Sequence, residues 1–450
     1  QLFHSSFKGL LTSSVVAYVL LFGIFLFHLM NETGLISSIA SFISCSTRDP
    51  VQQVILLVVA FSPLVESVSG FGIAIIVVAP ILVMLGFNRY KATILSLVGL
   101  SAVPWGALAT GTVIGSNLSE IPLQQLGAGS ALIALPTFLY FAFIAAYLSG
   151  GLHAIKQRWL ELTMVSVSLG ATIWLFSKFI SVELAGVVGS LVAIGVEFIF
   201  IRLALHHEKE AAIVTVTEQS TAVDQSVYGI RKAMSPYFFL TGMLVLTRII
   251  SPLDHFLTTH LVVDLPSYSF RLPILYSPGF FLLLACLYTI WIFKVPMKII
   301  TKSLHSTYKQ WIPVTLSTTA FVAMSECMSS AGMISVLAHA AVFSFGSSLI
   351  FISPIIAGLG GFLTGSNTGS NAMFIKLQVQ AAGQLGISPE LLAIAQNTSA
   401  SHMTMASPSR VLLGLSVCGI PEDESKVLRQ IGLIAIGAIL LITIVLVILI

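Results

Sequence analysis

The sequence predicts an all-α polytopic membrane protein made of two structural repeats, each with a broken transmembrane helix. Three observations support this fold class: a very apolar composition, one long polar stretch near the middle, and glycine- and serine-rich breaks within apolar segments of both halves. Of the 450 residues, 56% are hydrophobic and 9% are charged, and the mean hydropathy is +0.99. Soluble proteins carry about 25% charged residues, so only a helical membrane protein fits this composition.

Charge and cysteine content argue against several other classes. The formal net charge of +3 gives no indication of a nucleic-acid partner. Cys45, Cys286, Cys327 and Cys418 stand singly, without the CxxC spacing of a metal or disulfide framework. The chain starts at Gln1 without a signal-peptide pattern, so we expect the numbering to begin inside a longer protein.

Apolar segments follow one another along the chain, many of them near the 20 or so residues that a membrane span needs. In the first half the expected segments are residues 10–30, 51–65, 73–87, 92–114, 129–148, 160–180 and 183–205, with an interfacial helix within residues 31–50. In the second half they are residues 233–250, 273–293, 311–327, 333–345, 349–363, 372–385, 389–417 and 430–450. The polar residues 206–232 predict a linker between an N-terminal transmembrane repeat, residues 1–205, and a C-terminal one, residues 233–450.

The distribution of Lys and Arg predicts the orientation, because cytoplasmic loops carry an excess of both. The basic loops contain Lys156, Arg158, Arg231, Lys232, Lys294, Lys298, Lys302 and Lys309. Alternating spans place these loops on one side together with the linker, and residues 251–271 on the other. We therefore expect a multi-pass protein of the plasma (inner) membrane with a cytoplasmic linker. The lipid bilayer is its expected partner, and a homo-oligomer is compatible with the sequence.

Residues 358–371, GLGGFLTGSNTGSN, form the most unusual stretch of the chain. They contain five glycines, six Ser, Thr or Asn residues and no charge, and apolar sequence flanks them on both sides. Non-helical backbone at membrane depth is tolerated only where it is buried in protein or lines a wet cavity. The stretch therefore predicts the broken helix of a transport site. The alternative is a close helix crossing of small residues, which explains the glycines but not the six polar side chains.

The two halves show similar patterns at a shift of 300 positions. Residues 85–87, Leu-Gly-Phe, correspond to residues 385–387, Leu-Gly-Ile. Each half has a Gly/Ser break, a short apolar helix, a polar turn and then a longer segment interrupted at residues 101–106 or 397–408. Interrupted hydrophobic segments in corresponding positions are typical of transporters built from repeats, with the binding site between the repeats.

Helices that end inside the membrane expose unpaired backbone N–H groups and a positive partial charge of about half a unit. We expect Ser370 or Asn371 to cap a helix over residues 372–385, and Ser388 to begin the next helix. Such N-termini bind carboxylates. The oxygens of Ser, Thr and Asn, together with unwound carbonyl groups, can coordinate Na+ or relay protons.

Two motifs resemble the bacterial lactate permease family of monocarboxylate symporters. They are FLTGSNTGSNAMFIKLQ at residues 362–378 and VESVSGFG at residues 65–72, with looser likenesses at residues 82–87, 104–107 and 397–408. The similarity runs, with gaps, from about Gly9 to the end. It implies uptake of lactate or related 2-hydroxy acids such as glycolate with protons. It also implies membership of the wider ion-transporter superfamily, and hence two inverted structural repeats, each with a re-entrant helical hairpin and a broken transmembrane helix. In that superfamily, Ser-Asn-Thr motifs at hairpin tips contribute to ion and substrate sites.

The sequence departs from the family pattern at two positions. Asn367 stands where the family usually has an Asp, and residues 400–405 lack the family's Gly-Lys. One anionic and one cationic group are both missing, so the local charge balance is kept. Arg410 is the candidate to replace the missing cation; the alternative is that it snorkels at a helix end.

Charged residues at membrane depth are costly, by about 2.5–3.5 kcal/mol each, and therefore mark candidate sites. Glu66, beside the break of the first half, is predicted to carry a proton or bind a cation, or else to hold the hairpin as a hydrogen-bond acceptor. Glu326 and His402 are further candidates for coupling, with structural roles as the alternative; we expect His402 in an unwound stretch. Lys376 either reaches a bound anion or snorkels.

The predicted site has two parts. The substrate-binding residues are Ser69, Gly70, Phe71, Gly72, Gly365, Ser366, Asn367, Thr368, Ser370, Asn371, Asn397, Thr398, Ser399 and Arg410. The coupling residues are Glu66, His402 and Glu326, with a Na+ site at Ser366, Asn367 and Thr368 as the alternative to protons. No catalytic residue and no cofactor is expected apart from the coupling ion, H+ or Na+.

These observations predict a secondary active transporter that takes up a small monocarboxylate by proton or sodium symport with alternating access. A carrier of di- or tricarboxylates or another organic anion is the alternative, but few cations are available to bind several carboxylates. No Walker A motif supports ATP-driven transport, and no HExxH, paired-Asp or GxSxG pattern supports a membrane-embedded enzyme. A channel fits two broken halves less well than alternating access does.

Overall fold

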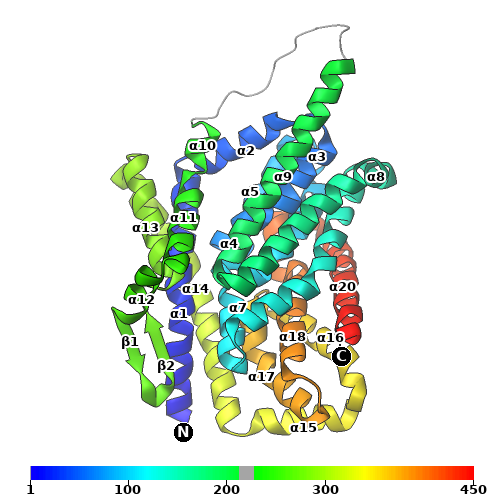
Figure 1. Ribbon diagram of the computed structural model, residues 1–450. Coiled ribbons are helices and arrows are strands. Elements are labelled where there is room, and N and C mark those ends of the chain that lie inside the picture. The colour runs from blue at the N-terminus through cyan, green and yellow to red at the C-terminus, as the bar shows by residue number, and fades with distance from the viewer. Residues whose placement is uncertain (1, 212–227, 450) are drawn as a thin grey trace.

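The computed structural model describes residues 2–211 and 228–449, and these residues are overwhelmingly helical. The helices of the first half are α1 (Leu2–Glu32), α2 (Leu35–Ser46), α3 (Pro50–Val54), the π-helix η1 (Ile55–Phe61), α4 (Ser62–Ser69), α5 (Ile73–Met84), α6 (Arg89–Val98), the 3-10 helix η2 (Leu100–Trp105), α7 (Gly106–Ser119), α8 (Leu123–Phe179) and α9 (Val182–Ala211). Together with the apolar spans, they confirm the predicted all-α membrane fold (Figure 1).

The second half contains one small β-hairpin among its helices. Its elements are α10 (Ile230–Ala233), α11 (Ser235–Ile249), α12 (Ser251–Thr259), β1 (Val262–Leu265), η3 (Pro266–Tyr268), β2 (Phe270–Pro273), α13 (Pro278–Ile292), α14 (Met297–Ser330), α15 (Met333–Phe345), η4 (Gly346–Ser348), α16 (Leu349–Thr364), α17 (Asn367–Leu385), α18 (Pro389–Met403), η5 (Thr404–Ala406), α19 (Pro408–Cys418), η6 (Pro421–Asp423) and α20 (Glu424–Leu449). The two strands are antiparallel, with Val262 opposite Pro273. The hairpin lies in what the sequence predicted to be a plain loop.

Seven of the described helical stretches are long and apolar enough to cross a membrane, or eight if α11 and α12, bent by 95°, form one span. The spans predicted at residues 129–148 and 160–180 are parts of the single helix α8, which has non-helical backbone at Gly151 and Arg158. Helix α9 extends to Ala211 and α10 begins at Ile230. Residues 212–227, the middle of the predicted linker, lie outside the described residues.

Two helical hairpins form where the sequence predicted breaks. Helices α4 and α5 meet at Gly70, Phe71 and Gly72, which have φ values of 66°, 54° and 79°. Helices α16 and α17 meet at Gly365, with φ 61°, and Ser366. Glycine adopts this left-handed backbone at no steric cost, so both reversals need very few residues.

The predicted caps Ser370 and Asn371 are wrong. Ser366 is the N-cap, and its Oγ accepts from the N–H of Gly369 at 3.2 Å. Helix α17 begins immediately after the reversal at Gly365, so Ser370 and Asn371 lie within its first turn and a half. Helix α18 begins at Pro389 as predicted, although the side chain of Ser388 makes no capping hydrogen bond.

The same order of elements recurs in both halves. Helices α5 and α6, the 3-10 turn η2 and helix α7 correspond to α17, α18, η5 and α19. Gly86 and Gly386 both have positive φ, 93° and 70°, at the turns between the paired helices. The second break is shorter than predicted, since α18 remains helical as far as Met403. The inverted relation of the two halves stays a prediction.

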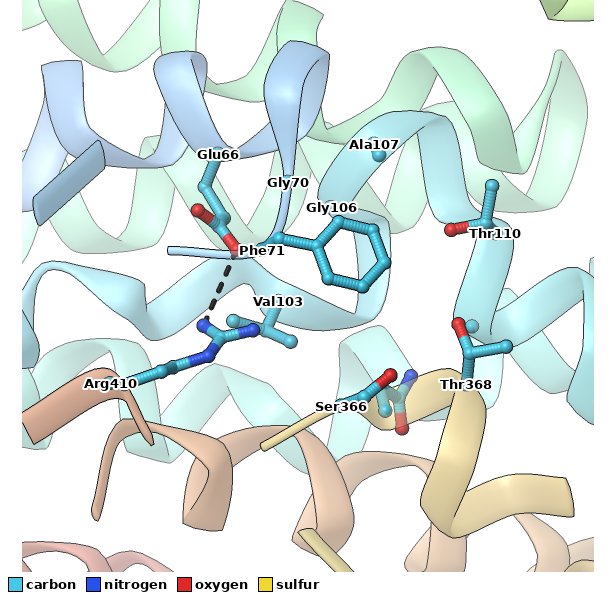
Figure 2. A pocket seen from close by; sticks show the side chains of 12 residues that line it. Glu66, Gly70, Phe71, Val103, Gly106, Ala107, Thr110, Ser366, Thr368 and Arg410 are labelled. Carbon is cyan, nitrogen blue, oxygen red and sulfur yellow. Dashed lines mark hydrogen bonds and ion pairs between the residues drawn. The ribbon is translucent and has the colours of Figure 1, made fainter. Parts of the chain in front are cut away.

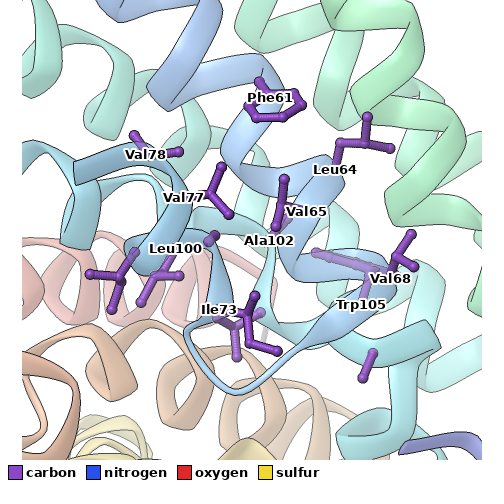
Figure 3. Close-up of a cluster of buried hydrophobic side chains, with 14 of the residues drawn as sticks. Phe61, Leu64, Val65, Val68, Ile73, Val77, Val78, Leu100, Ala102 and Trp105 are labelled. Atoms are coloured by element: carbon purple, nitrogen blue, oxygen red, sulfur yellow. The ribbon is translucent and has the colours of Figure 1, made fainter. Parts of the chain in front are cut away.

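The hairpins cross between the halves. Helix α5 packs against α19, whereas α17 packs against α7. Buried apolar side chains of α4, α5 and the turn η2 surround the first hairpin, among them Val65, Val77 and Trp105 (Figure 3). The small-residue crossing, the alternative for residues 358–371, also exists: a Cβ on Gly361 would lie 2.0 Å from the carbonyl oxygen of Ala400, so α16 and α18 touch there through their backbones.

Candidate functional site

A small buried pocket lies where the tips of the two hairpins meet (Figure 2). It is lined by Glu66, Gly70, Phe71, Val103, Gly106, Ala107, Thr110, Gly111, Ser366, Asn367, Thr368 and Arg410. Its volume of about 20 Å³ has room for roughly one water molecule. The structure therefore brings together residues from both hairpins, from the turn into α7 and from the start of α19.

Glu66 and Arg410 form an ion pair at this pocket, with Arg410 Nη1 3.4 Å from Glu66 Oε1. Their side chains are only 1% and 5% exposed, so the alternative for Arg410, that it snorkels at a helix end, is wrong. The carboxylate of Glu66 also accepts from the N–H of Gly72 at 3.2 and 3.1 Å, at the tip of its own hairpin. Arg410 Nε donates to the carbonyl of Gly365 at 3.1 Å, at the tip of the other hairpin.

The ion pair thus links the two hairpin tips. A buried ion pair is weak evidence for a gain in stability, because desolvation offsets the attraction between the charges. A pair that lines a pocket and also contacts both hairpin tips has the contacts expected of a binding centre. The alternative role of Glu66 is also observed, because its carboxylate accepts hydrogen bonds from Gly72 at the tip of its own hairpin.

The start of α7 has unusual backbone. Ala107, Leu108 and Ala109 have φ values of 38°, 52° and 63° in succession. Left-handed backbone at a non-glycine residue costs roughly 1–3 kcal/mol and clusters at functional sites. A Cβ on Gly70 would lie 2.7 Å from the Cβ of Ala107, so the first hairpin tip lies directly against this strained turn.

A network of buried amides supports the second hairpin. Asn397 Oδ1 accepts from Nδ2 of both Asn367, at 2.9 Å, and Asn371, at 2.8 Å. Asn397 Nδ2 donates to Ser130 Oγ at 2.9 Å and to Thr112 Oγ1 at 3.2 Å. These contacts fix the start of α17 to α18, α7 and α8. The Oδ1 atoms of Asn367 and Asn371 receive no hydrogen bond from the described residues.

A second, larger cavity of about 270 Å³ adjoins the pocket. Phe71, Ser366 and Arg410 line both spaces. The other lining residues of the cavity come from α14, the second hairpin and the start of α19: Gln310, Pro313, Val314, Ser317, Thr318, Phe321, Thr364, Gly365, Gly369, Ser409 and Leu413. Phe71 therefore lies at the boundary between the tight pocket and a space large enough for a small organic acid.

Several predicted substrate ligands line neither space. Ser69 Oγ donates to the carbonyl of Val65, and Thr398 Oγ1 donates to that of Ile394, within their own helices. Ser370 Oγ donates to Ala357 across the second hairpin. Gly72 donates its backbone N–H to Glu66. Asn371 and Asn397 belong to the amide network. Ser399 is buried with no hydrogen-bond partner for its hydroxyl among the described residues.

His402 and Glu326 lie away from the pocket. His402 is in the last turn of α18, so the unwound stretch predicted for it is wrong. Its Nε2 lies 2.7 Å from Thr137 Oγ1. Glu326 pairs with Lys376 at 2.9 Å and with Lys8 at 3.2 Å, so the ammonium group of Lys376 is engaged by a carboxylate.

Sequence reasoning missed much of the contribution of η2, α7 and α14. Val103, Ala107, Thr110 and Gly111 line the pocket, although only the break at residues 101–106 and the loose likeness at residues 104–107 had pointed there. Position 111 requires a glycine because α7 and α17 approach closely there: a Cβ on Gly111 would lie 2.6 Å from Asn367 Nδ2. No signal in the sequence indicated that the middle of α14 would line the larger cavity.

The chain matches the family described as L-lactate permease over residues 1–265 and 258–450. It is 25% identical over 456 residues to an L-lactate permease of Salmonella typhi, covering 92% of this chain and 80% of the relative. It is 26% identical over 458 residues to the glycolate permease GlcA of Escherichia coli strain K12, with the same coverage of 92% and 80%. A solved structure, the YdaH transporter of Alcanivorax borkumensis, aligns over 92% of this chain and 86% of its own with 14% identity and a TM-score of 0.37.

Proposed function

The chain belongs to the L-lactate permease family, and from this premise we propose that it takes up a small monocarboxylate, such as lactate or glycolate, by symport with a proton. The observation that carries the proposal is the Glu66–Arg410 pair in the pocket between the hairpin tips. A guanidinium group is the side chain best suited to a carboxylate, because it can donate two parallel hydrogen bonds. In this structure Glu66 occupies part of that position.

Charge balance couples the proton to the substrate. A proton on Glu66 leaves Arg410 without a counter-ion in a buried site, which is unfavourable. A substrate carboxylate that replaces Glu66 restores neutrality. Substrate binding without the proton would instead leave two carboxylates around one guanidinium. The favoured states are therefore the empty site with its ion pair, and the loaded site with both proton and substrate.

Loading requires the site to open. The pocket of about 20 Å³ is too small for a three-carbon acid, whereas the adjoining cavity of about 270 Å³ is large enough. A substrate that enters this cavity meets Arg410 and Ser366 directly and displaces Phe71 from the boundary. Because Glu66 holds one tip and Arg410 the other, breaking their contact frees the hairpins to move apart, as alternating access demands.

Sodium coupling and other substrates are the competing proposals. Asn367 Oδ1 receives no hydrogen bond from the described residues, and with oxygens of Ser366 and Thr368 it is the natural Na+ candidate. A di- or tricarboxylate needs additional cations, and among the residues lining the pocket and the cavity Arg410 is the single Arg or Lys. One carboxylate is therefore favoured.

The predicted orientation also remains part of the proposal. The chain is an integral membrane protein, and α10, the upper end of α9 and the bend of α8 lie toward the same end of the molecule (Figure 1). This common end carries basic residues and corresponds to the side that we propose to be cytoplasmic in the plasma (inner) membrane. A homo-oligomer stays a prediction from the sequence.

The experiment is uptake by purified protein in proteoliposomes. Labelled L-lactate and glycolate are supplied with an inward proton gradient, an inward Na+ gradient, both or neither, at a fixed membrane potential. We expect accumulation above the external concentration with the proton gradient alone. Accumulation that needs Na+ would replace the proton by sodium, and failure to concentrate either acid under any gradient would contradict symport of these acids.

A further inference from the structure

Two buried carboxyl groups lie on helices α8 and α9, which pack against each other, at a second place in the membrane domain. Glu161 on α8 is 3% exposed and Glu197 on α9 is fully buried. Glu197 precedes Ala204, the end of the apolar span of α9, by seven residues, which places it about 10 Å inside that end. Neither residue lines the pocket between the hairpin tips or the adjoining cavity.

The hydrogen bonds of this pair are unequal. Glu161 receives Gln52 Nε2 at 2.9 Å and Arg158 Nη1 at 3.0 Å. The guanidinium of Arg158 also contacts Asp49, the N-cap of α3. Both oxygens of Glu197 receive no hydrogen bond from the described residues, and Glu161 is the charged group with the largest electrostatic effect on the Glu197 carboxyl. Three acidic groups therefore share one cation.

No other charged group of the described chain compensates Glu197. The π-helix η1 and the turn η2, which pack against α9, contain no ionisable residue. Glu66 of α4 faces Arg410, and Glu120 follows the far end of α7. Arg248 of α11 donates to the carbonyl of Tyr276. The groups that face Glu197 are thus Glu161, Arg158 and Asp49.

We propose that Glu161 and Glu197 hold one proton between them, forming a proton-binding site separate from the pocket at the hairpin tips. Two neighbouring carboxyl groups that are removed from water cannot both ionise. With the proton on Glu197, its O–H donates to Glu161, which remains the ionised partner of Arg158 and Gln52. Asp49, whose side chain is 30% exposed, and Arg158 connect this site to the surface at the bend of α8.

Loss of this proton has a defined consequence for the fold. Two anions would face each other across the α8–α9 interface, with a single guanidinium nearby. The helix pair is therefore more stable when the site is protonated, and its stability falls as the pH rises through the range in which the proton leaves. An amide at position 197 keeps the hydrogen bond to Glu161 without the titration.

Infrared spectroscopy of the purified protein in lipid nanodiscs at neutral pH, without Na+, tests the site. We expect the wild type to show one more protonated-carboxyl C=O band, shifted in D2O, than Glu197→Gln. The matched control, Glu183→Gln on the first turn of the same helix, should keep the band. Glu161→Gln, whose amide can donate to an ionised Glu197, should lose it as well. Persistence of the band in both Glu197→Gln and Glu161→Gln would overturn the proposal.

Thermal unfolding supplies a second readout if a variant folds poorly in nanodiscs. The melting temperature of the wild type should fall with rising pH, above the usual range of a free carboxyl, more steeply than that of Glu197→Gln, while Glu183→Gln follows the wild type. Equal slopes would overturn the proposal. Loss of the wild-type band on addition of Na+ at constant pH would also overturn it, in favour of a cation held by the same carboxylates.

Discussion

Glu66 and Glu326 both lie in apolar sequence and both form buried ion pairs, but the partners and surroundings of the two carboxylates differ. Glu66 pairs with Arg410 at 3.4 Å and lines the pocket between the hairpin tips. Glu326 pairs with both Lys376, at 2.9 Å, and Lys8, at 3.2 Å, and lines neither that pocket nor the adjoining cavity. The first carboxylate pairs with a single cation, Arg410, which also lines the adjoining cavity. The second carboxylate pairs with two lysines, and these contacts join helices α1, α14 and α17.

The comparison teaches that burial and charge alone do not identify a coupling residue. Glu66 differs because it has a single cationic partner, and that partner lines a cavity that a ligand can enter. Glu326 pairs with two lysines and lines neither the pocket nor the adjoining cavity, which fits a structural role. The following variants test this distinction, from the largest expected effect on transport to the smallest.

Arg410→Gln should remove substrate binding. It deletes the guanidinium that a carboxylate requires and leaves Glu66 buried without its cation, and such losses cost about 2–5 kcal/mol in binding free energy. Binding of lactate by the purified protein, followed by calorimetry, measures the effect. Arg89→Gln, at an exposed arginine at the start of α6, is the matched control and should bind as the wild type does. Unchanged affinity in Arg410→Gln would exclude Arg410 as the carboxylate ligand.

Glu66→Gln should separate exchange from accumulation. The amide mimics the protonated carboxyl, so Arg410 stays available to the substrate, but no proton is released. Proteoliposomes should lose uptake driven by a proton gradient and keep the exchange of internal for external lactate. Glu120→Gln, an exposed glutamate that follows α7 in the same half, should retain both activities. If proton-driven accumulation survives in Glu66→Gln, the proton is bound elsewhere.

Glu326→Gln should damage stability more than transport. Its loss leaves Lys376, whose side chain is 14% exposed, without a counter-ion, and breaking a buried pair in this way costs about 3–5 kcal/mol. The melting temperature should therefore fall, while protein that remains folded still accumulates lactate under a proton gradient. Folded protein that exchanges lactate but no longer accumulates it would give Glu326 a role in coupling.

His402→Gln should have the smallest effect. The ring makes a hydrogen bond to Thr137 and an edge contact with Phe141, both within the packed core. Glutamine can keep the hydrogen bond, so initial rates of proton-driven uptake and their dependence on pH should remain close to those of the wild type. A changed pH profile at unaltered stability would show that His402 takes part in proton transfer.

Much of the fold could be predicted because its signals are local. Glycine at residues 70, 72 and 365 marks the two reversals, and the apolar flanks identify the membrane segments. Composition alone separates this chain from soluble proteins. The repeated order of helices and 3-10 turns also follows from short stretches of sequence that need no tertiary information.

The details of the site could not be predicted, because they depend on partners far along the chain. Arg410 meets Glu66 across 344 positions, and Lys376 meets Glu326 across 50. Snorkelling, anion binding and ion pairing are indistinguishable for such residues until the helices are placed. The same holds for Thr110 and Gly111, whose positions against Asn367 result from the crossing of α7 and α17.

Proton uptake on substrate binding tests the exchange between Glu66 and the substrate for Arg410 most directly. Calorimetric titration of the purified protein with lactate, in buffers of different ionisation enthalpy, yields the number of protons taken up. We predict about one proton per lactate in the wild type and about none in Glu66→Gln, by thermodynamic linkage. Equal proton uptake in the two proteins, or none in the wild type, would contradict the account.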